Sequence, residues 1–251
     1  MYRLGSKWDR PMNAQHGPSR KRVVLMRHGE VQYFDAQGGL VDPRSVTLTE
    51  AGQSQARAAA EMLACYPFNR AVCSTAPRTQ ETAAAVLLGR VTPLELIHDL
   101  REVRGGRFSA VPLEDIGRVI GRAFDQAAQE EERFIGGERF ADLEARVLSA
   151  FLQWLLGAPG DEVLLAVLHE GVNRLLLSWA LTDGRTAMAG LEQDPCCVNV
   201  IDFDIDDGRI IRKLVRMVNV TPVDLPKRTR SATGMEELCA VYSRHRQCCP
   251  S

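Results

Sequence analysis

The chain has 251 residues, of which 45% are hydrophobic and 25% are charged, and its formal net charge is −1. This length allows one large domain with a substantial buried core, and the balanced charge excludes a general attraction to nucleic acid or to a membrane surface. No apolar run approaches the roughly 18 residues that a membrane-spanning helix needs. The seven cysteines lack C-x-x-C spacing, which argues against a zinc site or a disulfide framework and favours a reducing cytoplasm.

The segment before the first apolar run is basic. Before Val23 it holds six Lys or Arg residues against a single acid, Asp9. A basic arm or a targeting peptide is one interpretation, although the segment lacks the apolar stretch of a secretory signal. We predict instead that residues 1–21 form a disordered, solvated leader.

Strand and helix patterns alternate along the first hundred residues. The short apolar runs are typical of buried strands, and an Ala-rich segment between two of them is typical of a helix. Thr49 suits the N-cap of that helix, and Pro77 suits the first turn of the next one. We predict strands at 22–27, 71–74 and 94–97 and helices at 50–64 and 77–88.

Residues 103–137 do not follow this alternation. They contain several glycines and one amphipathic stretch, Leu113–Arg133. We interpret the segment as an insertion between core elements that forms a lid.

The alternation resumes after the lid. Apolar residues from Phe140 to Trp154 recur at separations of three and four, which places them on one face of a helix. The turn sequence Asp206-Asp207-Gly208 is a hairpin signal, so at least one strand of the sheet is antiparallel. We predict strands at 162–168, 198–205 and 210–218 and a helix at 172–181.

These patterns define a layered α/β domain over residues 22–220. Beyond it the pattern fails, and Lys227 to Ser231 is polar and basic. We predict a polar C-terminal tail, 221–251, in which one short helix at 235–242 could dock.

Charged and nucleophilic residues follow the predicted strands at the point where each strand ends. Arg27 and His28 follow the first strand, Arg78 opens the helix after the second, Glu102 lies just past the third, and His169 ends the most apolar strand. Ligands of open α/β sheets bind outside the carboxyl ends of the strands. An arginine fork suits phosphate oxygens, and a histidine can form a covalent intermediate. The pattern therefore indicates phosphoryl chemistry through a phosphohistidine.

Five motifs in order resemble the histidine phosphatase superfamily, the phosphoglycerate mutase-like group. The resemblance covers about residues 22–218, and it implies a three-layer α/β/α sandwich with a mostly parallel sheet and one antiparallel strand. The motifs are Arg27-His28-Gly29-Glu30, Leu-Thr-x-x-Gly-x-x-Gln-Ala (48–56), Ser-x-x-x-Arg-Thr-x-Glu-Thr-Ala (74–83), Gly136-Gly137-Glu138 and His169-x-Gly171.

The resemblance also implies a role for each residue of the site. His28 would be the nucleophile, and Arg27, Arg78 and His169 would hold the phosphoryl oxygens and stabilise their charge. Glu102 would protonate the leaving oxygen and then deprotonate the attacking water. Catalysis of phosphoryl transfer needs positioning and positive charge, and these groups supply both without a metal or a cofactor. The implied activity is that of a histidine acid phosphatase-type phosphomonoesterase.

Departures from the family pattern leave alternatives open. Glu30 adjoins the nucleophile in sequence and is a second candidate for the proton donor. Mutases of the family usually carry Trp-Asn shortly after Arg-His-Gly-Glu, and Val31 to Asp35 lacks it, which disfavours a phosphoglycerate mutase-type isomerase. Glu170 stands where most members have a small residue, and we expect it to point away from the phosphate, in a first helical turn that favours an acid.

The expected partner is a small phosphorylated substrate. Its specificity should come from the lid and from the loop 31–46, neither of which carries a readable motif. The sequence does not distinguish a monomer from a homodimer. A non-catalytic binding protein on the same fold is a further alternative, although retention of all five site residues argues against it.

Overall fold

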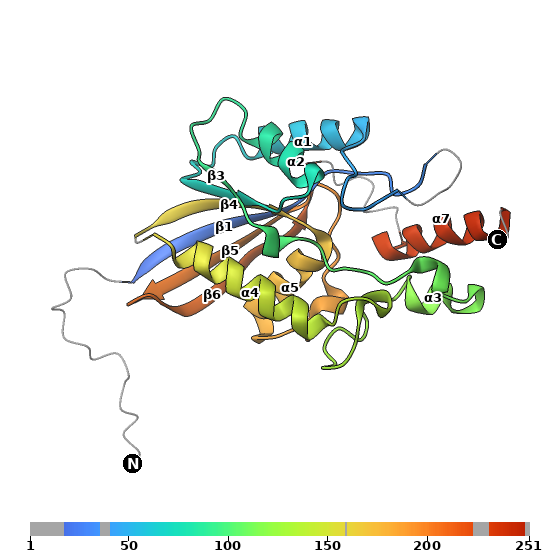
Figure 1. Cartoon of the computed structure of the whole chain (residues 1–251). Helices are drawn as coiled ribbons and strands as arrows, with labels where there is room; N and C mark the ends of the chain where they lie inside the picture. Colours follow the sequence, from blue (N-terminus) through green and yellow to red (C-terminus); the bar gives the residue numbers. More distant parts are fainter. Residues whose placement is uncertain (1–17, 36–40, 159, 223–230, 249–251) are drawn as a thin grey trace, which may run out of the picture.

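The computed structural model describes residues 18–35, 41–158, 160–222 and 231–248 (Figure 1). Within these residues six strands form a single sheet in the order β3–β2–β4–β1–β5–β6. The first four are parallel to one another, and β5 runs antiparallel to both of its neighbours, as predicted. The strands are β1 (Ser19–Arg27), β2 (Arg70–Cys73), β3 (Leu94–Leu96), β4 (Glu162–Leu168), β5 (Val198–Asp206) and β6 (Arg209–Val220).

Helices cover both faces of the sheet and make three layers (Figure 1). In β1, Val24 and Met26 pack into the core shared with α1 and α2, whereas Val23 and Leu25 pack into the core shared with α4 and α5. This alternation follows from the two-residue period of a strand. None of the helices in the described ranges is long and apolar enough to cross a membrane. The helices are α1 (Glu50–Met62), α2 (Pro77–Val86), α3 (Ile116–Val119), α4 (Phe140–Leu156), α5 (Glu170–Thr182) and α7 (Gly234–Cys248).

β1 begins at Ser19 rather than at Arg22, so the last residues of the predicted leader belong to the sheet. Lys21 is fully buried, and its Nζ donates 2.8 Å hydrogen bonds to the Leu155 carbonyl and to the Glu162 carboxylate. Arg20 pairs with Asp204 at 2.7 Å. These basic residues look solvated in the sequence because their acidic partners lie on β4 and β5, far along the chain. Residues 1–17 lie outside the described residues.

The predicted hairpin is confirmed. Asp207 and Gly208 join β5 to β6 with φ of 48° and 68°. Two positive φ values in succession are the requirement of the tight turn that matches the twist of paired strands.

The lid contains less regular structure than its amphipathic stretch suggests. Within 113–133, α3 spans only four residues, one of which is Gly117, and Gly121 lies just past its end. Both glycines weaken the amphipathic stretch, because glycine disfavours a helix interior. The two ends of the lid are held together: the Gly106 N–H donates to the Ile135 carbonyl at 3.0 Å, and the Glu138 N–H donates to the Arg104 carbonyl at 2.8 Å. We call these segments, 104–106 and 135–138, the lid stem.

The helix of the C-terminal tail is longer than predicted and is packed on the domain. α7 opens with reciprocal capping, in which Thr233 Oγ1 accepts from the Glu236 N–H and the Glu236 carboxylate accepts from the Thr233 N–H. Tyr242 is buried, with its ring 6.2 Å from that of Phe34 and 5.6 Å from that of Phe108. α7 therefore covers the loop after β1 and part of the lid, beside α3 (Figure 1). The basic run at 227–230 lies outside the described residues.

The first turn of α1 packs directly on the end of β1, and two glycines make this approach feasible. A Cβ atom on Gly52 would lie 2.2 Å from the Glu30 carbonyl oxygen, and one on Gly29 would lie 2.6 Å from the Gly52 carbonyl oxygen. Both obstacles are backbone atoms, so the chain itself would have to move.

Gly52→Ala is therefore expected to lower the free energy of unfolding by about 1–3 kcal/mol, the range typical of overpacking. Urea denaturation followed by circular dichroism measures this change. Gly117→Ala is the matched control, because a Cβ atom there meets nothing within 4 Å, and it should not lower the free energy of unfolding. Equal stability of the two variants would contradict the close approach of α1 and β1.

Candidate active site

The predicted site residues meet at the carboxyl ends of the parallel strands. Arg27 ends β1, His28 follows it, and His169 follows β4. Because β4 lies between β1 and β2, the ends of these strands are neighbours. Arg78, the second residue of α2, contacts both histidines, and the backbone of the turn after His169 contacts Glu102. The structure thus brings together all five residues that the sequence singled out.

The contacts of His28 define its tautomer. The ring is buried, with 2% of its surface exposed, and Nδ1 lies 2.7 Å from the Gly29 carbonyl oxygen. A carbonyl only accepts, so Nδ1 carries the hydrogen and Nε2 carries the lone pair. Burial, followed by the charges of Arg78 and Arg27, holds the pKa of His28 well below its ordinary value. The ring is therefore neutral and presents a nucleophilic nitrogen to the site.

Arg78 bridges the two histidines. Its Nε donates to His28 Nε2 and its Nη2 donates to His169 Nδ1, both at 3.2 Å. His169 Nε2 in turn donates to Ser74 Oγ at 2.7 Å, since its Nδ1 is occupied as an acceptor. Burial and the Arg78 charge lower the pKa of His169 well below its ordinary value, so this ring is neutral as well.

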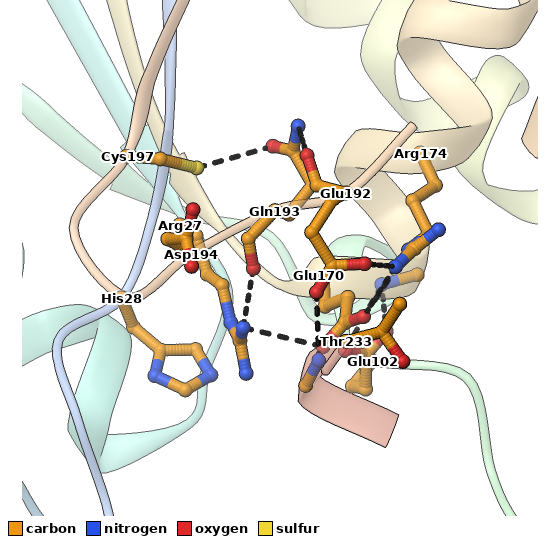
Figure 2. A network of polar contacts seen from close by, with 12 residues as sticks. Arg27, His28, Glu102, Glu170, Arg174, Glu192, Gln193, Asp194, Cys197 and Thr233 are labelled. Atoms are coloured by element: carbon orange, nitrogen blue, oxygen red, sulfur yellow. Dashed lines mark hydrogen bonds and ion pairs between the residues drawn. The ribbon is translucent and has the colours of Figure 1, made fainter. Parts of the chain in front are cut away.

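Arg27 is anchored through one of its terminal nitrogens. Nη1 donates to the Gln193 carbonyl at 2.5 Å and lies 3.2 Å from a carboxylate oxygen of Glu170 (Figure 2). Its Nε is buried and has no hydrogen-bond partner among the residues that the structure describes. The guanidinium is therefore fixed in place while retaining donors for an anion.

The two candidate acids occupy different environments. Glu102 accepts from the Val103 N–H at 2.9 Å and from the Gly171 N–H at 3.1 Å, beside His169. Burial and the nearby Glu170 charge raise the pKa of Glu102, against the opposing effect of these N–H groups. Glu30 is exposed, and its carboxylate accepts instead from the Thr49 hydroxyl at the start of α1. Of the two acids, Glu102 is the one whose charge acts on Arg27 and is acted on by Arg78.

Glu170 begins α5, as predicted, but its side chain is not remote from the site. Its carboxylate is buried between Arg27 and Arg174, which donates to it at 2.9 Å (Figure 2). Arg174 also pairs with Glu192 at 2.6 Å. The acid next to the second histidine is thus balanced by two guanidiniums, which explains how the site accommodates it.

Several supporting residues have no predicted role. Ser74 bonds to His169, and Thr82 Oγ1 accepts from the Gly29 N–H at 3.1 Å. Both lie within the quoted motif at 74–83, so the sequence carried a signal for them. Gln193 acts through its backbone carbonyl, which no side-chain pattern could indicate. Among the described ranges, no group of three His, Cys, Asp or Glu side chains is arranged to hold a metal ion.

A neutral, buried histidine beside two guanidiniums, at the carboxyl edge of a mostly parallel sheet, suits the binding and transfer of a phosphoryl group. The chain belongs to the histidine phosphatase superfamily, branch 1, whose family model matches residues 23–215.

Known relatives are consistent with this membership. Over 208 residues the chain is 31% identical to the probable 2-carboxy-D-arabinitol-1-phosphatase of Arabidopsis thaliana, a match that covers 80% of this chain but 42% of the plant protein. It is 29% identical to the adenosylcobalamin/alpha-ribazole phosphatase of Salmonella typhimurium, covering 72% of this chain and 90% of that protein. The crystal structure of the alpha-ribazole phosphatase from Shigella flexneri superposes with a TM-score of 0.60 at 25% identity, covering 79% of this chain and 96% of the other.

Proposed function

We propose that the protein is a metal-independent phosphatase that hydrolyses a small-molecule phosphate monoester through a phosphohistidine at His28. The observation that carries the proposal is the fixed tautomer of His28, which leaves the Nε2 lone pair facing Arg78 and close to the charge of Arg27. Nε2 attacks phosphorus as the bond to the ester oxygen breaks, and the Gly29 carbonyl stabilises the ring as it becomes cationic. Named relatives that are phosphatases support hydrolysis in general.

Arg27 and Arg78 hold the transferring group. Their N–H groups donate to the phosphoryl oxygens, over which negative charge is spread in the transition state. The bound dianion raises the pKa of His169, which burial and Arg78 depress in the unliganded site. His169 then gains a proton on Nδ1 and becomes a third donor.

Glu102 completes the cycle as acid and then base. It gives its proton to the departing ester oxygen while the phosphorus–nitrogen bond forms. Water then attacks phosphorus and gives its proton to Glu102, the phosphorus–nitrogen bond breaks, and inorganic phosphate leaves with His28 neutral again. The raised pKa of Glu102 favours the protonated carboxyl that the first step needs.

An assay with p-nitrophenyl phosphate and a panel of sugar and nucleotide phosphates tests the proposal. We expect turnover without added metal and inhibition by vanadate. A coupled assay of phosphoglycerate mutase activity, the alternative that relatives named as mutases keep open, should be negative. Absence of turnover with every ester, from mildly acidic to neutral pH, would refute the proposal.

The pH dependence of the same reaction follows from two shifted pKa values. The pKa of His28 lies well below 6.5, so the nucleophile stays deprotonated into the acidic range. The pKa of Glu102 lies above 4.5, so the acid keeps its proton to higher pH than a free carboxyl. We expect kcat/KM for an alkyl phosphate to peak on the acidic side of neutrality and to fall as Glu102 ionises. A rate that climbs steadily from acidic to alkaline pH would contradict these assignments.

We also propose a reducing compartment, the cytoplasm. Cys73 and Cys196 are buried and form no disulfide, and burial raises the pKa of both thiols to about 12. Such thiols are unreactive and behave as small apolar side chains.

A further inference from the structure

The Gly136-Gly137-Glu138 motif lies outside the phosphate pocket. Glu138 is buried, with 7% of its surface exposed, and its carboxylate accepts from Arg146 Nε at 2.7 Å and from Arg146 Nη2 at 2.9 Å. It also accepts from the Arg104 N–H at 3.0 Å. Although burial favours the neutral acid, these hydrogen bonds outweigh it and lower the pKa of Glu138. The carboxylate is thus a permanent anion clamped by the Arg146 fork.

The rest of the Arg146 guanidinium binds the segment that carries Glu102. Nη1 donates to the carbonyls of Asp99 and Arg101 at 2.7 and 2.8 Å, and Nη2 donates to the carbonyl of Glu102 at 3.1 Å. A guanidinium has five N–H donors, and five acceptors surround this one. One side chain therefore fixes the backbone from 99 to 102, which runs from a short 3-10 turn (His98–Leu100) to the start of the lid.

Glu138 fixes the same segment on the other side of Glu102. It receives the Arg104 N–H on its carboxylate and gives its own N–H to the Arg104 carbonyl at 2.8 Å. Gly137 makes this contact feasible, since a Cβ atom there would lie 2.1 Å from the Arg104 carbonyl oxygen. The motif thus brings the backbone of the lid stem against the residues that follow Glu102.

We propose that Glu138 and Arg146 are positioning residues that hold the Glu102 carboxyl at the leaving oxygen of the substrate. The inference rests on the proposed function, because it needs Glu102 to be the proton donor. A purely structural role in holding the lid would affect all substrates alike. If the pair positions Glu102, its loss should slow the reactions that depend on protonation of the leaving group and spare those that do not.

Two substrates separate these consequences. p-Nitrophenolate leaves without a proton, whereas the alkoxide of 2-glycerophosphate, or of any alkyl monoester that the wild type hydrolyses, needs one. The ratio of kcat/KM for the alkyl ester to kcat/KM for p-nitrophenyl phosphate is measured on one preparation, so a partly unfolded variant lowers both values equally and leaves the ratio unchanged.

Glu138→Gln is expected to lower this ratio about 30-fold, within the range of a displaced general acid, while p-nitrophenyl phosphate hydrolysis falls less than about 3-fold. Arg146→Lys keeps the charge but loses the fork and should lower the ratio in the same way. Glu144→Gln, on the same helix and paired with Arg185 at 3.0 Å, should leave it unchanged.

Glu102→Gln sets the reference and should lower the ratio at least as far. Suppose that Glu102→Gln lowers the ratio but that Glu138→Gln and Arg146→Lys both leave it unchanged. This result would overturn the positioning role and leave the proposed function intact. An unchanged ratio in Glu102→Gln itself would remove Glu102 as the proton donor, and this inference with it.

Discussion

Replacing His28 by alanine is expected to lower kcat/KM for p-nitrophenyl phosphate by at least ~10⁴-fold, the scale on which loss of a catalytic nucleophile acts. We do not expect His169 to replace it, because its Nε2 donates to Ser74 and its Nδ1 is proposed to hold the phosphoryl oxygens. Rapid quench in alkaline detergent preserves a phosphohistidine formed from substrate with radiolabelled phosphate. The wild type should give labelled protein that loses its label on acid treatment, and the variant should give none.

His98→Ala is the control for this experiment. His98 is exposed, and its Nδ1 lies 3.3 Å from the Thr75 hydroxyl rather than near either site histidine. It should retain both turnover and the labelled intermediate. Persistence of label in the His28 variant would show that another residue is the nucleophile.

Arg78→Ala is the second substitution with a large expected effect. It removes a donor from the phosphoryl oxygens and should lower kcat/KM by about 10²–10³-fold. It also removes a charge that depresses the pKa of His28, so His28 should protonate at higher pH and the acidic limb of the profile should move toward neutrality. A pH profile of kcat/KM for p-nitrophenyl phosphate measures both effects.

Arg78→Lys separates the two contributions of this side chain. It keeps the positive charge, which should hold the acidic limb in place, but it cannot bridge two rings as the planar fork does, so the rate should stay low. Arg118→Ala, with a side chain that is 73% exposed, should behave as wild type. An Arg78→Ala enzyme with near wild-type rate and an unmoved acidic limb would exclude the proposed role.

Sequence reasoning could predict the fold because each layer leaves a local pattern. Each element can be recognised from residues that are close together in the sequence. Examples are the apolar runs of β1 and β4, the helical spacing from Phe140 to Trp154 and the Asp207-Gly208 turn. The site residues could also be predicted, since parallel strands that alternate with helices bring their carboxyl ends to one edge of the sheet. Their catalytic roles stay predictions until the variants are measured.

Contacts between distant segments could not be predicted. Lys21 has the composition of a solvated leader, and only the folded chain shows that the end of α4 and Glu162 bury it. Arg146 recognises backbone carbonyls, which every sequence possesses, so no residue type indicates its targets. Glu170 looked unfavourable beside a phosphate because its counterbalance comes partly from Arg27, which lies 143 positions earlier in the chain.

The lid and the tail show the same limit in another form. An amphipathic stretch does not specify a helix when Gly117 and Gly121 interrupt it, and a polar segment can still dock through a few apolar residues such as Met235 and Tyr242. In both cases the structure depends on packing contacts that form only when the whole domain folds, and the composition of the segment alone does not reveal them.

The position of α7 has a practical consequence for immobilised enzyme. β1 starts at the amino ends of the parallel strands, opposite the site, whereas α7 packs over the loop after β1 and against the lid (Figure 1). A surface linkage or fusion partner attached before Ser19 therefore joins the sheet at the edge opposite the site residues. The same attachment at the end of α7 loads a helix that packs on the lid and on the loop after β1, so we expect coupling for a biosensor or a flow reactor to preserve more activity on the amino-terminal side.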